Sequence, residues 1–211
     1  MENRLAQRST RQALRTTLRS RRRALTPRQQ TLAAHQLLQQ LKRQPLFLRS
    51  QRLAFYLPSD GEIDPRPLIR EAWRRGKQCY LPVLAPDKSN RLWFVRYTPT
   101  TRLFKNRFGI PEPRLQTQQR LAAQHLDVVF LPLVGFDRQG GRMGMGGGFY
   151  DRSLAFKQTA SRHSPYLVGL AHHGQQVEQL HLAHWDIPLC AIATDHEIIV
   201  ANPAAQRDFY R

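Results

Sequence analysis

The chain has 211 residues, of which 41% are hydrophobic, and its 33 Lys and Arg residues against 15 Asp and Glu give a formal charge of +18. No apolar run approaches the ~18 residues of a membrane span, and the opening MENRLAQRSTRQ lacks the apolar core of a secretory signal. The two cysteines, Cys79 and Cys190, offer no disulfide framework. These features exclude a membrane-spanning protein and a disulfide scaffold, and we expect a cytoplasmic protein.

The positive charge is concentrated near the N-terminus, where eight arginines lie in the first 23 residues. A solvated surface, a nucleic-acid partner and an anionic substrate are each compatible with such a charge. Neither zinc-finger spacing nor an RNA-binding aromatic signature is present. Nucleic-acid binding therefore remains an alternative rather than the leading interpretation.

Residues 8–24 are predicted to form a helix, with Leu14 and Leu18 on an apolar face. Arg11, Arg15 and Arg19 follow one another at i, i+4 spacing, where like charges repel. An anionic partner would relieve that repulsion, although a solvated face explains the stripe equally well. A second helix is predicted from the capping box at Thr26 to about Gln44.

The remaining chain alternates between apolar strands and helical segments. The expected strands are 52–58, 77–84, 91–97, 127–134, 165–172, 190–195 and 197–201, and the expected helices are 65–75, 117–124 and a short one within 149–158. Strands separated by helices indicate a mostly parallel sheet with helices on both faces. We predict an α/β fold of the three-layer Rossmann-like type, as one domain over residues 1–211.

The stretch GRMGMGGGFYDRS is the most informative one, because six of the twelve glycines lie between Gly140 and Gly148. Such a glycine run is typical either of a flexible linker or of a backbone that approaches a ligand closely. An apolar strand precedes this stretch and a short helix follows it, which favours a phosphate-binding loop. Its spacing matches neither a Walker loop nor a complete GxGxxG pattern.

A second candidate is Glu62, in SDGEID after the first of these strands. Ligands of open parallel sheets bind beyond the carboxyl ends of the strands. We therefore expect Glu62 to lie beside the glycine loop.

Five segments together carry a family resemblance. GGRMGMGGGFYDR resembles the RLGxGGGYYD signature of the 5-formyltetrahydrofolate cyclo-ligase family. In the same order as in that family, RQALR (11–15) resembles its KxxLR, and YLPSDGEID (56–64) its substrate-binding segment. NRFGIPEP (106–113) and HWDIPL (184–189) resemble two further elements. The resemblance covers nearly the whole chain.

The resemblance implies an enzyme that converts 5-formyltetrahydrofolate, or its polyglutamylated forms, to 5,10-methenyltetrahydrofolate. ATP and Mg²⁺ would be required, and the formyl oxygen would be phosphorylated before N10 attacks it. We expect a monomer without a membrane partner, and a basic nucleic-acid-binding protein with the same fold is the less favoured alternative.

The same resemblance assigns residues to roles. Arg142, Tyr150 and Glu62 would be catalytic, and Asp151 and Asp186 would hold Mg²⁺, a cation that prefers carboxylate oxygens. The residues expected to contact ATP are Arg11, Arg15, Arg142, Met143, Gly144, Met145, Gly146, Gly147, Gly148, Phe149 and Tyr150. Those expected to contact folate are Leu57, Glu62, Phe108, Met145, Gly146, Gly147, Gly148 and Phe149. We expect the group Arg11, Arg15 and Arg142 to bind phosphates and to contribute little to the stability of the fold.

Three positions depart from the family pattern. Arg11 replaces a lysine, and Phe149 lacks the hydroxyl of the first tyrosine in YYD. Cys190 stands where many members carry an acidic residue, and we expect it to be a small core residue. Gln175 matches a recurrent family glutamine and is expected to line the site.

Overall fold

A computed structural model describes residues 2–87, 89–115, 120–158, 165–180 and 186–210. Its centre is an eight-stranded sheet with the order β12-β11-β10-β7-β1-β2-β3-β6. The strands are β1 (Arg52–Ala54), β2 (Gln78–Leu84), β3 (Leu92–Tyr97), β6 (Arg120–Leu121), β7 (Val128–Pro132), β10 (Tyr166–Leu170), β11 (Ala191–Ala193) and β12 (Ile198–Val200). The middle of the sheet, from β11 to β2, is parallel, whereas β12, β3 and β6 pair antiparallel at its edges. The prediction of a mostly parallel α/β fold is confirmed.

Helices lie on both faces of the sheet because the side chains of each strand alternate between the faces. Leu53, Val128 and Phe130 join the core beneath one set of helices, and Phe55 stacks on Phe130 with ring centroids 4.9 Å apart. That set comprises α2 (Pro27–Leu41), α3 (Pro45–Arg49), α4 (Arg66–Arg74) and α6 (Gln206–Tyr210). The opposite face, which includes Val129, packs against α5 (Phe149–Ser153) and two short 3₁₀ turns, Ala123–His125 and Ala155–Gln158.

The boundaries of two N-terminal helices differ from those expected. Helix α1 begins at Glu2 rather than at residue 8 and runs to Arg23. Helix α2 has the expected capping box at Thr26 but ends at Leu41. Pro45 begins the separate helix α3, and a residue that precedes proline is unfavourable in a helix.

The helix expected over 117–124 is not found in its described part. Residues 116–119 lie outside the described structure, Arg120–Leu121 form strand β6, and Ala123–His125 form a 3₁₀ turn. Strand β6 pairs with the exposed edge of β3, Phe94 opposite Leu121. This tertiary pairing outweighs the local helical preference.

Two hairpins matter for the site. Strands β8 (Gly135–Phe136) and β9 (Arg142–Met143) follow β7, so Gly140 and Gly141 lie in their turn and not in the loop expected to bind phosphate. Strands β4 (Leu103–Lys105) and β5 (Pro111–Pro113) form the second hairpin, whose tip carries Phe108. In that tip the Asn106 side chain accepts the N–H groups of Phe108 and Ile110.

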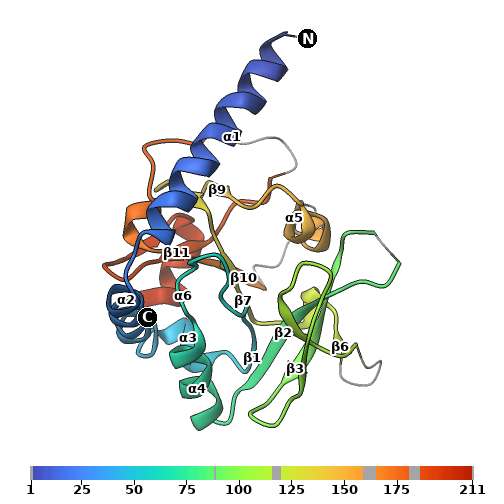
Figure 1. Ribbon diagram of the computed structural model, residues 1–211. Helices are drawn as coiled ribbons and strands as arrows, with labels where there is room; N and C mark the ends of the chain where they lie inside the picture. The colour runs from blue at the N-terminus through green and yellow to red at the C-terminus, as the bar shows by residue number, and fades with distance from the viewer. Residues whose placement is uncertain (1, 88, 116–119, 159–164, 181–185, 211) are drawn as a thin grey trace.

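Helix α1 extends away from the body of the molecule, so that its N-terminal turns project beyond the sheet (Figure 1). Its C-terminal half packs on the body, where Leu18 is fully buried with Val134, Met143 and Leu180. Within the described residues, none of the helices has the length and apolar character needed to cross a membrane.

Candidate active site

The loop after β1 is fixed to the C-terminal end of α1 by one acidic residue. Asp60 accepts hydrogen bonds from Arg19, at 2.8 Å, from Arg22, at 2.7 Å, and from Arg23. Burial raises the pKa of this carboxyl, but the three arginines outweigh burial and hold the pKa well below its usual range. Asp60 and Gly61 both have positive φ, +52° and +75°, so the chain turns sharply under the helix.

Arg22 is the central residue of this junction, and its side chain is fully buried. Its Nε donates to the Asp60 carbonyl at 2.8 Å, and its Nη1 donates to the Leu133 carbonyl at 2.9 Å. It thus joins α1, the loop after β1 and the end of β7. Its role was not predicted from the sequence, although Arg22 continues the spacing of the buried stripe formed by Leu14 and Leu18.

Glu62 lies next to Arg22 and is almost enclosed. Its carboxylate accepts the Ser59 N–H at 3.0 Å and lies 3.8 Å from Arg22 Nη2. Burial raises the pKa of Glu62, while Ser59 and Arg22 lower it. Burial also raises the pKa of the Tyr150 hydroxyl, and the nearby Glu62 carboxylate raises it further. Two of the three side chains expected to be catalytic, Glu62 and Tyr150, are therefore close enough for the charge of one to affect the other.

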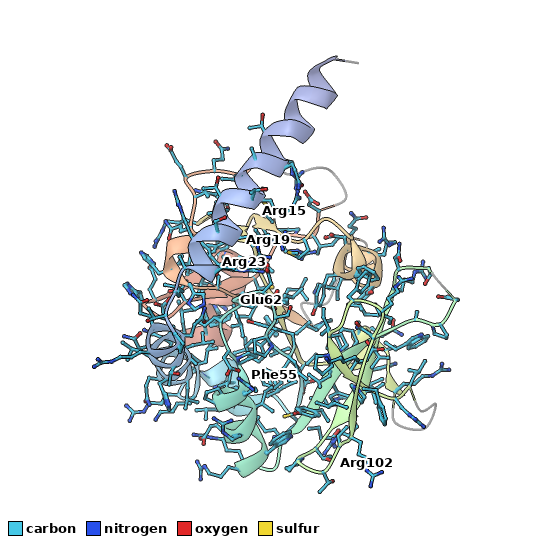
Figure 2. The ribbon with its side chains drawn as sticks, in the orientation of Figure 1. Arg15, Arg19, Arg23, Phe55, Glu62 and Arg102 are labelled. Carbon is cyan, nitrogen blue, oxygen red and sulfur yellow. The ribbon has the colours of Figure 1, made fainter. Side chains whose placement is uncertain are left out.

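The glycine loop between β9 and α5 lies against α1. Arg15 Nε donates to the Gly144 carbonyl at 2.9 Å. A Cβ placed at Gly146 would lie 3.8 Å from the Arg15 guanidinium carbon, and one at Gly144 would meet open space. Figure 2 shows Arg15, Arg19 and Arg23 following α1 above Glu62. Burial lowers the pKa of Arg15, and the neighbouring charges of Arg11 and Arg19 lower it further.

The backbone N–H groups of this loop are available to donate hydrogen bonds to a ligand. In the described part of the chain, no protein acceptor is bonded to the N–H groups of Gly144 to Gly148. Gly146 and Gly148 have φ of +92° and +64°, which places successive N–H groups in a concave arrangement that suits an anion. Met143 differs from the other loop residues, because its side chain is buried in the core and only its backbone lies near the loop.

Arg142 is held differently from Arg15. Its buried guanidinium donates to the Ile187 carbonyl at 2.8 Å and pairs with Asp151. Arg142 thus joins the glycine loop to the segment that carries Asp186, and it is a structural residue as well as a candidate ligand. These buried contacts lead us to expect a contribution of Arg142 to the fold, unlike the small contribution predicted from the sequence for all three arginines.

The two carboxylates expected to bind a metal are each paired with an arginine. Asp151 pairs with Arg142, and Asp186 lies 3.5 Å from Arg11. No cluster of three metal-binding side chains occurs among the described residues. These carboxylates therefore fit a hard cation only if phosphate oxygens and water complete its coordination, which is the usual arrangement for Mg²⁺.

Exposed apolar side chains lie next to the glycine loop. The rings of Phe108 and Phe149 meet edge to face, 5.8 Å apart at 83°. Phe108 and Met145 are 56% and 51% exposed. Leu57 is half-buried and packs against the core. The Phe108 and Phe149 rings together offer an apolar wall to a flat ring system.

Gln175, which was expected to line the site, and Cys190, which was expected in the core, are both buried. Gln175 is 1% exposed, and its amide donates to the Leu133 and Val134 carbonyls at 2.7 and 3.0 Å, so it supports the site from beneath instead of lining it. Cys190 is buried in the main hydrophobic core, which confirms the prediction of a small core residue.

Comparisons with known proteins show the family to which the chain is similar. The model of the 5-formyltetrahydrofolate cyclo-ligase family matches residues 7–195. The chain is 44% identical to the 5-formyltetrahydrofolate cyclo-ligase of Escherichia coli (strain K12), over 86% of this chain and 98% of that protein. It is 46% identical to the protein of the same name from Haemophilus influenzae, over 85% and 94%.

Solved structures give the same result. The 5,10-methenyltetrahydrofolate synthetase of Aquifex aeolicus has a TM-score of 0.77 at 30% identity and covers 91% of this chain and 93% of its own. The corresponding synthetase from Mycoplasma pneumoniae shares the fold, with a TM-score of 0.67 at 21% identity. The resemblance inferred from five short segments is confirmed, and the chain belongs to the 5-formyltetrahydrofolate cyclo-ligase family.

Proposed function

We propose that this chain converts 5-formyltetrahydrofolate to 5,10-methenyltetrahydrofolate with consumption of ATP in the presence of Mg²⁺. The observation that carries the proposal is the hydrogen bond from Arg15 to the Gly144 carbonyl. It fixes the basic face of α1 to a glycine loop with free N–H groups, beside the enclosed carboxylate of Glu62. Family membership supports the reaction, and this geometry supports its residue roles.

The glycine loop fits the polyphosphate of ATP. Its N–H groups without a protein acceptor among the described residues and the open space beside Gly144 permit close approach, and Arg15 supplies a positive charge at the same place. Arg11 and Arg19 crowd Arg15 with like charge, and a bound polyphosphate would relieve this repulsion. Met143 would contribute only through its backbone.

Asp151 and Asp186 fit a magnesium ion bound together with the phosphates. Each carboxylate would bind the cation either in place of its arginine partner or together with it. Both carboxylates are accessible enough for this, since the side chains of Asp151 and Asp186 are 26% and 12% exposed. Arg142 would remain between the two carboxylate segments through the Ile187 carbonyl.

The folate would lie between Glu62 and the apolar wall of Phe108 and Phe149. The Glu62 carboxylate would accept N–H groups of the pterin, a charge-assisted contact that is strong in an enclosed site. Because its pKa is raised, the Tyr150 hydroxyl stays protonated at neutral pH. This group would therefore donate a hydrogen bond to the reacting region.

Formyl activation would come from bound ATP, which supplies a phosphoryl group that makes the formyl oxygen a leaving group. The chain would hold the formyl oxygen in line with the γ-phosphate and its leaving oxygen, would keep N10 next to the formyl carbon, and would neutralise the developing charge. Arg15 and the loop N–H groups would neutralise the phosphates, and Glu62 would fix the pterin so that N10 reaches the formyl carbon.

The proposal is tested by following methenyltetrahydrofolate formation spectroscopically from 5-formyltetrahydrofolate. Product should form only when both ATP and Mg²⁺ are present, with one ADP released for each product molecule. Absence of product under these conditions, or equal product without ATP, would contradict it.

The proposal also includes a monomeric enzyme that acts in the cytoplasm, and the proposed reaction involves no nucleic acid. Both cysteines are buried and no disulfide joins them, as expected in a reducing compartment. Light scattering after size-exclusion chromatography would test the monomeric state.

A further inference from the structure

A basic cavity lies at the edge of the sheet that is opposite to the candidate active site. It measures about 700 Å³ and is lined by Arg96, Thr98, Thr100, Thr101, Arg102, Phe104, Pro113 and Arg114. Arg96 is at the end of β3 and pairs with Tyr80 near the start of β2. The cavity therefore adjoins the N-terminal ends of the parallel strands, whereas the active site follows their C-terminal ends. Figure 2 shows Arg102 at the far end of the molecule from Arg15.

The three arginines of this cavity have no carboxylate partner. Among the described residues, neither Arg96, Arg102 nor Arg114 forms an ion pair. The neighbouring carboxylate of Glu112 is instead bonded to the Asn106 amide at 2.9 Å. Guanidinium groups that line one cavity without a counter-charge repel one another, and an anion bound between them would reduce that cost.

The cavity also contains hydroxyl donors. Thr98 Oγ1 lies 3.2 Å from Thr100 Oγ1 and 2.9 Å from Thr101 Oγ1, and Thr101 Oγ1 accepts the Thr98 N–H. The three hydroxyl protons serve two hydroxyl–hydroxyl bonds, so one donor remains for a ligand.

An aromatic surface completes the lining. Phe104 is 42% exposed, and the Arg114 guanidinium lies over its ring, 4.3 Å from the centroid. A ring stacked on a guanidinium is a platform on which a flat base can stack. The volume is that of an ordinary small-ligand site.

We propose that this cavity binds a nucleotide, with its phosphate between the arginines and its base against Phe104 and Arg114. The nucleotide can be free or part of a single-stranded RNA, because both present the same phosphate and base. This site is separate from the proposed ATP site and does not depend on the proposed reaction.

The test is calorimetric titration of the full chain with uridine 5′-monophosphate at 0.15 M salt, where the general field of the protein is screened at about 8 Å. The variant Arg102→Ala/Arg114→Ala should weaken binding at least tenfold, whereas turnover of 5-formyltetrahydrofolate should not change. The matched control is Arg43→Ala/Arg70→Ala, which removes the same charge from two exposed positions elsewhere. The active-site variant Arg15→Ala should also retain binding.

A second variant, Phe104→Leu, separates the base from the phosphate. It should weaken binding of the nucleotide but not of pyrophosphate. An oligouridylate that binds more tightly than uridine 5′-monophosphate, and whose binding is lost in Arg102→Ala/Arg114→Ala, would support the proposal and identify RNA as the source of the bound nucleotide. Three outcomes would each overturn the proposal. Nucleotide binding could be unchanged in Arg102→Ala/Arg114→Ala, it could be lost equally in the control variant, or pyrophosphate could bind as tightly as the nucleotide.

Discussion

The fully buried guanidinium of Arg22 lies 3.8 Å from the carboxylate of Glu62, and this pair joins helix α1 to the loop after β1. Arg22 also donates to the carbonyls of Asp60 and Leu133. One side chain therefore holds the helix that carries the arginines proposed to bind phosphate, and it lies beside the carboxylate proposed to bind the pterin. The proposed roles predict that stability and substrate binding are coupled at this point.

The first prediction concerns Arg22. Arg22→Met should lower the free energy of unfolding by about 3 to 5 kcal/mol, because it leaves buried acceptors without a donor. Arg23→Ala is the matched control, since Arg23 also pairs with Asp60 but its side chain is 53% exposed. That change should cost about 1 kcal/mol or less. Urea unfolding of both variants measures the difference, and equal losses would contradict the central role of Arg22.

The second prediction concerns Glu62. Glu62→Gln should raise the KM for folate roughly tenfold to hundredfold, as expected for the loss of a charged hydrogen bond, and should change the KM for ATP little. Steady-state kinetics with each substrate varied in turn measures both constants. An equal shift in the two KM values would place Glu62 outside the pterin site.

The same carboxylate predicts a pH dependence. Burial raises the pKa of Glu62 above its ordinary 4.5, so the folate KM should rise as pH falls toward that raised pKa. Because the folded state favours the protonated form, ionised Glu62 lowers stability at neutral pH. Glu62→Gln should therefore be at least as stable as the wild type there and should lack the acid limb of the KM profile.

The third prediction concerns Arg15. Arg15→Ala should raise the KM for ATP at every salt concentration and leave thermal stability nearly unchanged, because removing it relieves repulsion from Arg11 and Arg19. Arg21→Ala, an exposed position on the same helix, is the control for the general positive field. The control should alter kcat/KM only at low salt.

Arg142 should behave differently from Arg15. Its buried bonds to Asp151 and the Ile187 carbonyl mean that Arg142→Ala should lower both activity and the melting temperature. A melting temperature equal to that of the wild type would restore the simpler expectation that both arginines serve only the phosphates.

The sequence predicts the fold class and the place of the candidate site, but it does not predict that Arg142 is buried and paired whereas Arg15 is not. The alternation of apolar strands and helices indicates the α/β class, because it reflects burial on two faces of a sheet. The positions of Glu62 and the glycine loop after strand ends were also predictable, since parallel strands bring such loops to one edge.

The residues with which each charged side chain pairs could not be predicted from the sequence. The residue types around buried Arg22 and exposed Arg23 do not distinguish the two arginines. Only the i+4 spacing of Arg22 from Leu18 indicates that Arg22 lies on the buried face of the helix. The antiparallel edges of the sheet, the β8–β9 hairpin and the pairing of Arg142 with Asp151 depend on contacts between distant segments. Such contacts outweigh local preference, as they do at β6.

The fourth prediction concerns acid stability. Because three arginines hold the pKa of Asp60 well below its ordinary 3.8, the ionised carboxylate stabilises the folded state above about pH 4 and loses this contribution as pH falls below it. Asp60→Asn should therefore be less stable than the wild type at neutral pH, with the difference shrinking in acid. Glu178→Gln, at an exposed position, should show no such convergence in urea unfolding between pH 2 and 7.

The last prediction separates metal binding from structure. Asp186→Asn and Asp151→Asn should each raise the Mg²⁺ concentration needed for half-maximal turnover, since each loses a charged oxygen ligand. Only Asp151→Asn should also lower the melting temperature, because Asp151 pairs with a buried guanidinium whereas the Arg11 side chain that faces Asp186 is 34% exposed. Asp186→Asn is thus the cleaner test. If it keeps the wild-type Mg²⁺ requirement at saturating ATP and folate, then Asp186 has a structural role that includes its pairing with Arg11, and the cation must be held by other groups. If excess Mg²⁺ restores its turnover while leaving that of Arg15→Ala unchanged, the carboxylate and the phosphate contact act on different components of the same site, as the geometry requires.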